Sequence, residues 1–514
     1  MNPDFSDQWD KLKHIASNHD IRDIQGLFAI DTNRNQNLSF EAHDIFIDFS
    51  KNWMTADLFS QLITLANEAQ LKNKIEALFA GKPINISEKK PAAHTSQRKL
   101  KATEKIVQDR EKMFFIAENY FSGVYKTAFN KKVKTVVNIG IGGSYLGPKL
   151  AVQALSDLQT SNDIKVLFFP SVDDVALVSL LQNCDLTSTL FCVSSKSLGT
   201  IETISNKKTI LDLLKNITDY NPSSANQSFV VATTNQDKAK ELAIPSSHIM
   251  PFDHATGGRF SVWSSIGFPV LMAIGREKFL QFLAGAECMD EHFAQTDFQH
   301  NIPVLMALLS VWYRNFIDLP AYAVIPYDVR LRNLPAWLQQ LMMESNGKMI
   351  DQNGRNLDIS TSPWVFGDHG QLSQHAFFQT FHQGNDILPI DFIGVIDKNS
   401  ENQNFLLINM LAQSAALMNG NKSNNIQNLC PGNRPSTTIL LKELTPSSLG
   451  QLLAMYEHMI FVQSVIWNIN CFDQPGVELG KNIAKNIVSH LKDGTLGDIN
   501  LDKSTKQLLN RVLK

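Results

Sequence analysis

The feature that most constrains the fold is an alternation of short apolar runs with helical patterns, which begins at Lys134. Each run is rich in β-branched residues, ends in Gly, Ser or Asp, and precedes a stretch with helical spacing. Strands that alternate with helices in this way favour a parallel sheet with crossover helices. The pattern therefore predicts an α/β domain with strands at Thr135–Ile141, Val166–Phe169, Leu190–Val193 and Phe229–Ala232.

The alternation returns after a predicted helical bridge at about 276–317, in the runs Tyr322–Ile325, Trp364–Phe366 and Asp391–Val395. Residues 1–130 instead carry apolar residues at three-to-four spacing, which predicts helices. We therefore expect an α/β protein of two αβα sandwich domains with parallel sheets and helical extensions at both ends. The predicted division is a helical N-terminal extension (1–105), a first and larger domain (106–290), a second domain (291–481) and a C-terminal helical tail (482–514).

Composition argues against several classes of function. Of the 514 residues, 47 are Lys or Arg and 50 are Asp or Glu, so the net charge is −3 and no overall field recruits nucleic acid or an anionic membrane. Five widely spaced cysteines without a CxxC pair are typical of reduced thiols in a cytoplasmic protein. The N-terminus shows no signal-peptide pattern, and the apolar stretch Phe260–Ile274 is too short to cross a bilayer, so it predicts a buried helix.

A glycine-rich turn with the sequence IGIGGS ends the first predicted strand. Glycines let backbone N–H groups approach a ligand closely, and the N-terminus of the following helix favours an anion. Ser144 is suited to cap that helix. Tyr145 stands where a dinucleotide motif needs glycine, and no Gly-Lys-Ser/Thr follows, so neither a dinucleotide motif nor a Walker loop is indicated. A turn without a ligand explains this motif about equally well.

A second polar loop, SSKSLGT, follows the run Leu190–Val193. Its hydroxyls can donate to phosphate oxygens and Lys196 adds positive charge, so the loop indicates a phosphate site more strongly than an ordinary capped helix. No basic patch with interleaved aromatic residues accompanies it. We therefore expect a small phosphorylated metabolite rather than a nucleic acid.

Two charged residues stand in unusual positions. Arg259 follows two glycines at the start of the predicted buried helix, where it could stabilise negative charge during a reaction or cap backbone carbonyls. Gln340 and Glu344 lie four residues apart on one predicted helix that Gly347 ends. Near a helix C-terminus the dipole makes a carboxylate a better base. A solvated surface glutamate is the plain alternative.

The histidine-rich segment does not have the spacing of a metal site. His375 and His382 lie seven residues apart, two turns along one predicted helix, and no HExxH motif accompanies them. We therefore expect no metal and no other cofactor. Two roles remain open for these histidines: acid–base catalysis by one of them, or packing of both in the core. Lys481, after a Pro-Gly turn, could equally be a surface lysine.

Eight motifs occur in the order found in the phosphoglucose isomerase family, which the chain resembles from about Val136 to Lys481. They are IGIGGS, SSKSxxTxET, GGRFS, PYDxRLxxxP, QQxxMESNGK, QHAFxQxxHQG, GNRPS and FDQxGVELGK. Ser197, Tyr145, Ser373 and Pro475 depart from residues common in the family, and none of these changes removes a group with an assigned chemical role.

The resemblance implies an enzyme that interconverts glucose 6-phosphate and fructose 6-phosphate through an enediol(ate). It also implies two sugar-isomerase (SIS) domains and a homodimer with a shared active site. The composition has already indicated a cytoplasmic protein without a nucleic-acid or membrane partner. Glu344 would carry a proton between C2 and C1, Arg259 would stabilise the intermediate, and Lys481 with His375 from the other subunit would assist ring opening. The implied substrate-binding residues are Gly143, Ser144, Ser195, Lys196, Ser197, Thr200, Gly258, Gln340 and Gln474.

Two other functions remain open at this point. An isomerase of mannose 6-phosphate would use the same kind of base, and no residue excludes it. A sugar-phosphate-binding regulator would keep the phosphate loop without catalysis. The regulator is disfavoured because it would not require the four residues Glu344, Arg259, His375 and Lys481.

Overall fold

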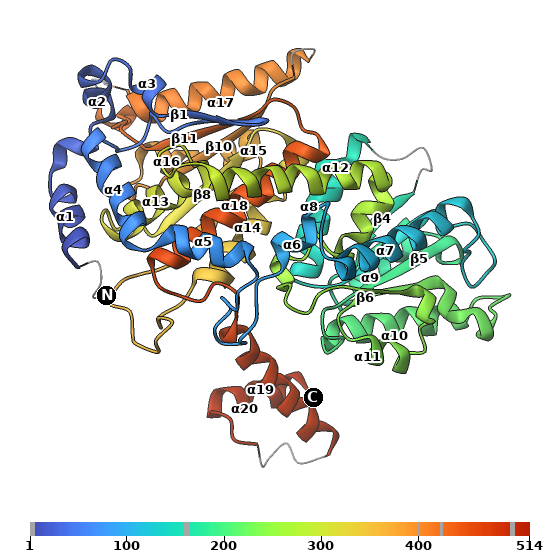
Figure 1. Cartoon of the computed structure of the whole chain (residues 1–514). Coiled ribbons are helices and arrows are strands. Elements are labelled where there is room, and N and C mark those ends of the chain that lie inside the picture. The colour runs from blue at the N-terminus through green and yellow to red at the C-terminus, as the bar shows by residue number, and fades with distance from the viewer. Residues whose placement is uncertain (1–5, 159–163, 398–399, 422–424, 494–498, 514) are drawn as a thin grey trace. The chain divides into compact units, whose positions relative to one another are not determined.

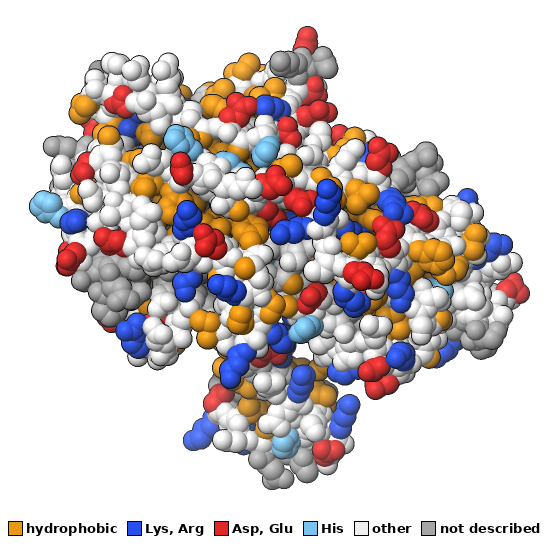
Figure 2. All heavy atoms as spheres, in the orientation of Figure 1, with side chains coloured by type: hydrophobic (Ala, Val, Ile, Leu, Met, Phe, Trp, Pro, Cys, Tyr) orange, Lys and Arg blue, Asp and Glu red, His pale blue; other side chains and the backbone are white. Residues whose placement is uncertain are grey.

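The computed structural model describes residues 6–158, 164–397, 400–421, 425–493 and 499–513. The chain divides into two compact units, the first ending at Cys471 and the second running from Phe472 to the end of the chain. The first unit contains both β-sheets (Figure 1). On the face shown in Figure 2, acidic and basic side chains are interspersed, in agreement with the small net charge.

The first sheet has five parallel strands in the order β4–β3–β5–β6–β7. Its three central strands are buried along their whole length, as expected for a parallel sheet that is covered on both faces. Four of the five strands match the runs predicted from the sequence, and β7 was not predicted. The strands are β3 (Thr135–Ile139), β4 (Lys165–Phe168), β5 (Thr189–Ser194), β6 (Phe229–Thr233) and β7 (Ile249–Pro251).

Helices cover both faces of this sheet. Alternate strand residues such as Val137, Phe191 and Val231 pack into one apolar core with side chains of α9, α10 and α11. The elements α7, α8 and α12 contact the sheet strands as well. The bounds are α7 (Glu104–Ser122), α8 (Gly143–Ala154), α9 (Asp174–Asn183), α10 (Ile201–Lys215), α11 (Gln236–Glu241) and α12 (Phe268–Gln295).

The second sheet has six strands in the order β1–β2–β11–β10–β8–β9. Strands β11, β10, β8 and β9 are parallel, whereas β2 runs antiparallel to both β11 and β1. Phe392 of β10 lies in a core with Phe378, Phe381 and Met410 from the helices that cover the sheet. The strands are β1 (Ser39–Ala42), β2 (Ile45–Asp48), β8 (Ala321–Pro326), β9 (Trp364–Phe366), β10 (Ile390–Val395) and β11 (Ser436–Leu441).

The hairpin β1–β2 is the main departure from the predicted organisation. It lies within the stretch 1–105, for which only helices were expected, and it extends the second sheet through the pair Ile439–Ile47. Strand β11 was not predicted either. The rest of that stretch is helical where it is regular: α1 (Ser6–Ala16), α2 (Ile24–Ile30), α3 (Arg34–Asn37), α4 (Ala56–Glu68), α5 (Leu71–Phe79) and α6 (His94–Arg98).

Two long helices, α12 and α18 (Pro446–Ile466), approach each other closely. A Cβ on Gly285 would lie 1.9 Å from the carbonyl oxygen of Ser447, and one on Gly450 would lie 2.2 Å from that of Phe282. Only glycine permits this contact. The apolar stretch Phe260–Ile274 is buried, but the helix begins at Phe268, and Gly275 (φ 81°, ψ 170°) kinks it.

The remaining helices of the first unit are α13 (Ile302–Asn315), α14 (Leu334–Leu338), α15 (Gly370–Ala376), α16 (Phe378–Gln383) and α17 (Glu401–Asn419). The second unit contains α19 (Pro475–Lys492) and α20 (Lys503–Val512). Helix α19 continues across the predicted boundary at 481, and α12 continues across the one at 290. The division into four parts stays a prediction. No helix in the described part of the chain is long and apolar enough to span a bilayer.

Candidate active site

The loops that follow β3 and β7 touch each other. A Cβ on Gly143 would lie 2.1 Å from the carbonyl carbon and oxygen of Gly258 and 2.5 Å from the backbone nitrogen of Arg259. The glycines of the IGIGGS motif therefore bring the N-terminus of α8 against the segment that carries the arginine. The prediction that Ser144 caps α8 is wrong, because the N-cap is Gly142 with a φ of 58°.

Asn138 joins the glycine-rich turn to the polar loop after β5. Its side-chain N–H donates to the carbonyl of Ser144 at 2.8 Å, and its oxygen accepts from the hydroxyl of Ser194 at 2.6 Å. The sequence analysis did not single out this residue. The available signal was a polar side chain within an otherwise apolar strand.

The predicted phosphate loop lies between β5 and α10, as the sequence indicated. The Ser195 hydroxyl accepts from the backbone N–H of Leu198, and that of Ser197 accepts from Gly199, both at 3.2 Å. Thr200 is the N-cap residue of α10, and its side chain makes no cap hydrogen bond. These bonds fold the loop into a compact turn at a helix N-terminus, the arrangement that suits an anion.

Lys196 in this loop is partly buried. Desolvation lowers the pKa of its ammonium group, while the negative charge of Glu88 opposes that shift and the positive charges of Lys90 and Arg259 add to it. The lysine therefore lies within the electrostatic range of Arg259. A bound anion would counter the cost of burying this cation.

Arg259 is buried, and nitrogens of its guanidinium donate to neighbouring groups. Nε donates to the hydroxyl of Ser345 at 2.6 Å, and Nη2 donates to the carbonyl of Cys471 at 2.5 Å. Nη1 lies 3.8 Å from Oε2 of Glu344. The structure thus brings together the arginine and the carboxylate that the sequence singled out. The role of Ser345 was missed, although it directly follows Glu344 in the MESNGK motif.

Glu344 was predicted to lie on a regular α-helix. It lies instead on a π-helical turn, Gln339–Glu344, that follows α14. Such turns occur frequently at functional sites. The Glu344 side chain is 17% exposed, and its Oε2 accepts no hydrogen bond from the described residues; the same holds for Oε1 of Gln340. Gln340 also lies beside Gly142, whose Cβ would be 3.1 Å from Nε2 of Gln340. Two buried acceptors thus lack a donor, and the side chain that carries one of them lies beside the glycine-rich turn.

The other predicted residues lie on α15 and in the second unit. His375 and His382 do not share one helix, because Phe377 (φ −138°, ψ 1°) separates α15 from α16. His375 is exposed, whereas His382 contacts Gln413 at 3.0 Å. Gln474 and Lys481 belong to the second unit, where Lys481 pairs with Glu478 at 3.0 Å.

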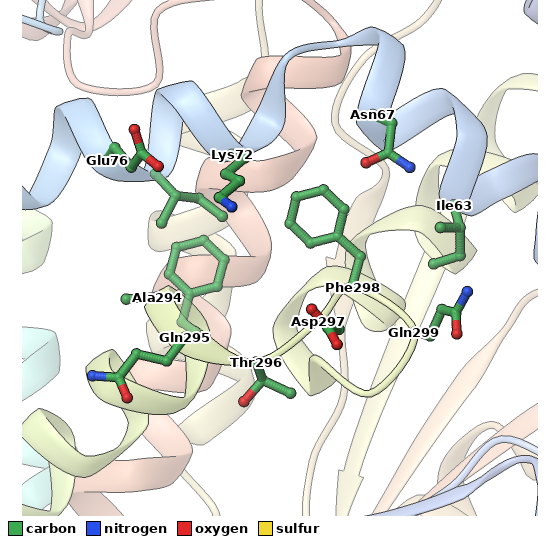
Figure 3. Close-up of a pocket in the computed structure, with 12 residues that line it drawn as sticks. Ile63, Asn67, Lys72, Glu76, Ala294, Gln295, Thr296, Asp297, Phe298 and Gln299 are labelled. Carbon is green, nitrogen blue, oxygen red and sulfur yellow. The ribbon is translucent and has the colours of Figure 1, made fainter.

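A cavity of about 450 Å³ lies elsewhere in the first unit (Figure 3). It opens between the helices α4 and α5 on one side and the segment that joins α12 to α13 on the other. Asn67, Lys72 and Glu76 face Asp297 and Phe298 across it. None of the predicted site residues lines this cavity. Within the described ranges, no group of three or more His, Cys, Asp and Glu side chains is arranged to hold a metal ion.

The geometry defines an α/β enzyme site in which a carboxylate stands beside a buried arginine, and that arginine lies within electrostatic range of Lys196 in the polar loop after β5. Comparison with known proteins agrees with this class. The family model of phosphoglucose isomerase matches residues 48–509. A glucose-6-phosphate isomerase of Acinetobacter baumannii (strain AYE) is 39% identical over 543 residues, covering 99% of this chain and 98% of that protein.

A second relative, glucose-6-phosphate isomerase 1 of Chromohalobacter salexigens, is 41% identical over 520 residues, covering 98% of this chain and 94% of its own. The crystal structure of a glucose-6-phosphate isomerase from Chlamydia trachomatis superposes with a TM-score of 0.87 at 31% identity, covering 99% of each chain. The chain belongs to the phosphoglucose isomerase family, and the predicted family and α/β fold class are confirmed.

Proposed function

We propose that the chain is an aldose–ketose isomerase that interconverts D-glucose 6-phosphate and D-fructose 6-phosphate, a step of glycolysis and gluconeogenesis. Membership of the family and the names of its full-length relatives support this activity. The observation that carries the mechanism is the position of Glu344. Its buried Oε2 accepts no hydrogen bond from the described residues and lies 3.8 Å from the guanidinium of Arg259.

In the proposed reaction, one base moves the carbon-bound proton between C2 and C1. Glu344 takes the proton from C2 of the open-chain aldose, the C2–H electrons form a C1–C2 double bond, and the carbonyl oxygen on C1 gains negative charge. Arg259 supplies the positive charge that stabilises this enediolate. The hydroxyl proton on O2 passes to O1, which leaves the negative charge on O2. Glu344 then returns its proton to C1, and the carbonyl forms at C2. The residue types present suffice for this exchange without a metal or a redox cofactor.

The phosphate group of the substrate would bind in the loop after β5. Binding energy from this remote group can orient C1 and C2 against Glu344. Hydroxyl and ammonium donors at a helix N-terminus support this assignment. The residues proposed to bind the phosphate are Ser195, Lys196, Ser197 and Thr200, and those proposed to line the sugar are Gly143, Ser144, Gly258, Gln340 and Gln474.

Ring opening would use His375 and Lys481 in a homodimer, with His375 acting in the active site of the other subunit. The exposure of His375 on α15 supports a role outside its own subunit. Helix α17 exposes the apolar side chains of Phe405, Ile408 and Leu411, spaced three residues apart, which favours a protein partner on this face. We place the enzyme in the cytoplasm because its five cysteines are free and widely spaced.

The variant Glu344→Gln tests the proposed base. Glutamine keeps the size of the side chain but cannot take up a proton, so kcat should fall about a thousandfold. The assay couples glucose 6-phosphate formed from fructose 6-phosphate to its dehydrogenase, with mannose 6-phosphate run as a second substrate. Glu41→Gln, an exposed glutamate paired with Lys442, is the matched control. Near-normal turnover by Glu344→Gln would remove Glu344 from the role.

Mixing two inactive variants tests the shared active site. In a heterodimer of His375→Ala and Glu344→Gln subunits, one site would combine an intact Glu344 with an intact His375 from its partner. Activity should therefore reappear when the two variants are unfolded together and refolded, at about a quarter of the wild-type value if subunits pair at random. Failure of refolded mixtures to regain activity, while refolded wild type does, would contradict a His375 that acts across the interface.

A further inference from the structure

A cluster of buried ionisable side chains lies outside the proposed catalytic residues. Arg98 of α6, Asp290 of α12, and Glu457 and His458 of α18 form this buried ion cluster, and each is at most 3% exposed. Arg98 donates to Asp290 from Nε at 2.8 Å and to Glu457 from Nη1, and His458 contacts Asp290 at 2.6 Å. Three separate helices are joined at this point.

A contribution to the stability of the fold does not by itself explain this buried ion cluster. Removing charged groups from water is costly, and replacing a buried ion pair by apolar side chains is often neutral or stabilising. Burial raises the pKa of Glu457 against the opposing effect of Arg98, and burial lowers the pKa of His458. A role in holding a particular neighbour in place accounts for these charges better.

The neighbour that the cluster holds is the segment that carries Arg259. The indole N–H of Trp263 donates to both carboxylate oxygens of Glu457, at 3.0 and 3.2 Å, and the guanidinium of Arg98 lies 4.9 Å from the Trp263 ring centroid. At the other end of the segment, the ring of Phe260 packs on His94 at 4.8 Å. The Trp263 ring therefore contacts Arg98 of α6 and its ion partner Glu457, and the Phe260 ring contacts His94 of α6.

Hydrogen bonds within the segment transmit this anchoring to the arginine. The hydroxyl of Ser261 donates to the carbonyl of Gly258 at 2.6 Å, and that of Ser264 donates to the carbonyl of Ser261 at 2.7 Å. Residues 258–264 therefore form a short, internally bonded unit. A displacement at Trp263 would be passed to the backbone of Arg259.

We propose that Trp263, held by Glu457 and Arg98, is a positioning residue for Arg259. The bond from its indole N–H to Glu457 keeps the guanidinium in place against Ser345 and Glu344. This inference rests on the proposed isomerase function. The cluster is covered on its far side by Phe293, which stacks on His458 at 4.1 Å and lines the cavity of Figure 3.

The test is Trp263→Phe, which removes the N–H and keeps an aromatic ring against Phe282. We expect kcat to fall about tenfold with KM for fructose 6-phosphate changed less than twofold, because the proposed phosphate loop is a separate segment. The matched control is Trp312→Phe, since Trp312 is equally buried and its indole nitrogen has no hydrogen-bond partner in the described structure. This control should keep the wild-type kcat.

A second comparison separates positioning from general loss of structure. If Trp263 acts through Arg259, Trp263→Phe should change kcat less than twofold in an Arg259→Lys background. An equal tenfold loss in both backgrounds would overturn the proposal, as would wild-type kcat in Trp263→Phe itself. Glu457→Gln changes the acceptor of the hydrogen bond from Trp263 and should cause the same loss of kcat. An inactive wild-type enzyme would instead refute the proposed function, and this proposal with it.

Discussion

Gly143→Ala gives a direct test of the contact between the glycine-rich turn and the arginine segment. The added Cβ would lie 2.1 Å from the carbonyl carbon and oxygen of Gly258 and 2.5 Å from the nitrogen of Arg259. All three atoms belong to the backbone, so no side-chain rotation can relieve the overlap. The φ angle of Gly143 is not in the left-handed region, so alanine adds no local backbone strain.

The size of the effect follows from this overlap. Carbon atoms in favourable contact lie about 3.5–4.0 Å apart, so the two backbones must separate by about 1 Å or more. A misplacement of about 1 Å at a reacting group can cost about a hundredfold in rate. Overpacking typically costs about 1–3 kcal/mol, out of a total stability of about 5–15 kcal/mol. We therefore expect a folded enzyme whose kcat/KM is lower by about a hundredfold.

The measurement is steady-state kinetics of fructose 6-phosphate isomerisation, together with a thermal melt to show that the variant folds. Gly147→Ala in the same helix is the control. Its Cβ would lie 3.2 Å from the Cβ of Val262, so Val262 needs to move by only a few tenths of an ångström, and kcat/KM should fall less than threefold. If Gly143→Ala kept kcat/KM within threefold of wild type, the contact between these two loops would have no part in catalysis.

Two further predictions concern the phosphate loop and pH. Lys196→Ala should raise KM for fructose 6-phosphate about tenfold or more, because a charge-assisted hydrogen bond is worth about 1.5–3 kcal/mol, and an unchanged KM would place the phosphate elsewhere. Burial lowers the pKa of His248 from 6.5 to about 4, so the unfolded state binds more protons and stability falls as the pH falls. Denaturant unfolding of wild type should lose about 2 kcal/mol more between pH 7 and 5 than His248→Phe, and identical pH profiles would contradict this.

The sequence predicted the central strands of the first sheet well because each is a short apolar run that glycine, serine or threonine ends. It did not predict the hairpin β1–β2, in which β2 pairs with β11 almost 400 positions later. Local apolar spacing carries no information about such a distant partner. The break at Phe377 between α15 and α16 was missed for a related reason, since Phe377 packs between Phe366 and Phe381 and its backbone follows that packing.

For the candidate site, the sequence pointed to the proposed reacting groups better than to the residues that hold them. Arg259 and Glu344 stand in unusual motifs, and the structure brings them together. Ser345 and the carbonyl of Cys471 have no such signal. A serine in a helical turn usually faces solvent or its own helix, and every residue has a carbonyl. These two groups matter because the guanidinium of Arg259 lies beside them, and only the folded chain determines that position.

These holding groups bear on how the carboxylate can act as a base. A guanidinium placed directly on a carboxylate forms two parallel hydrogen bonds, which stabilise the ionised form and oppose uptake of a proton. Here Nε and Nη2 of Arg259 donate to Ser345 and Cys471, and Nη1 stays 3.8 Å from Glu344, beyond hydrogen-bond distance. In the proposed mechanism, the arginine is thus near enough to stabilise an enediolate bound beside both groups, and it forms no hydrogen bond with the carboxylate that would take the substrate proton.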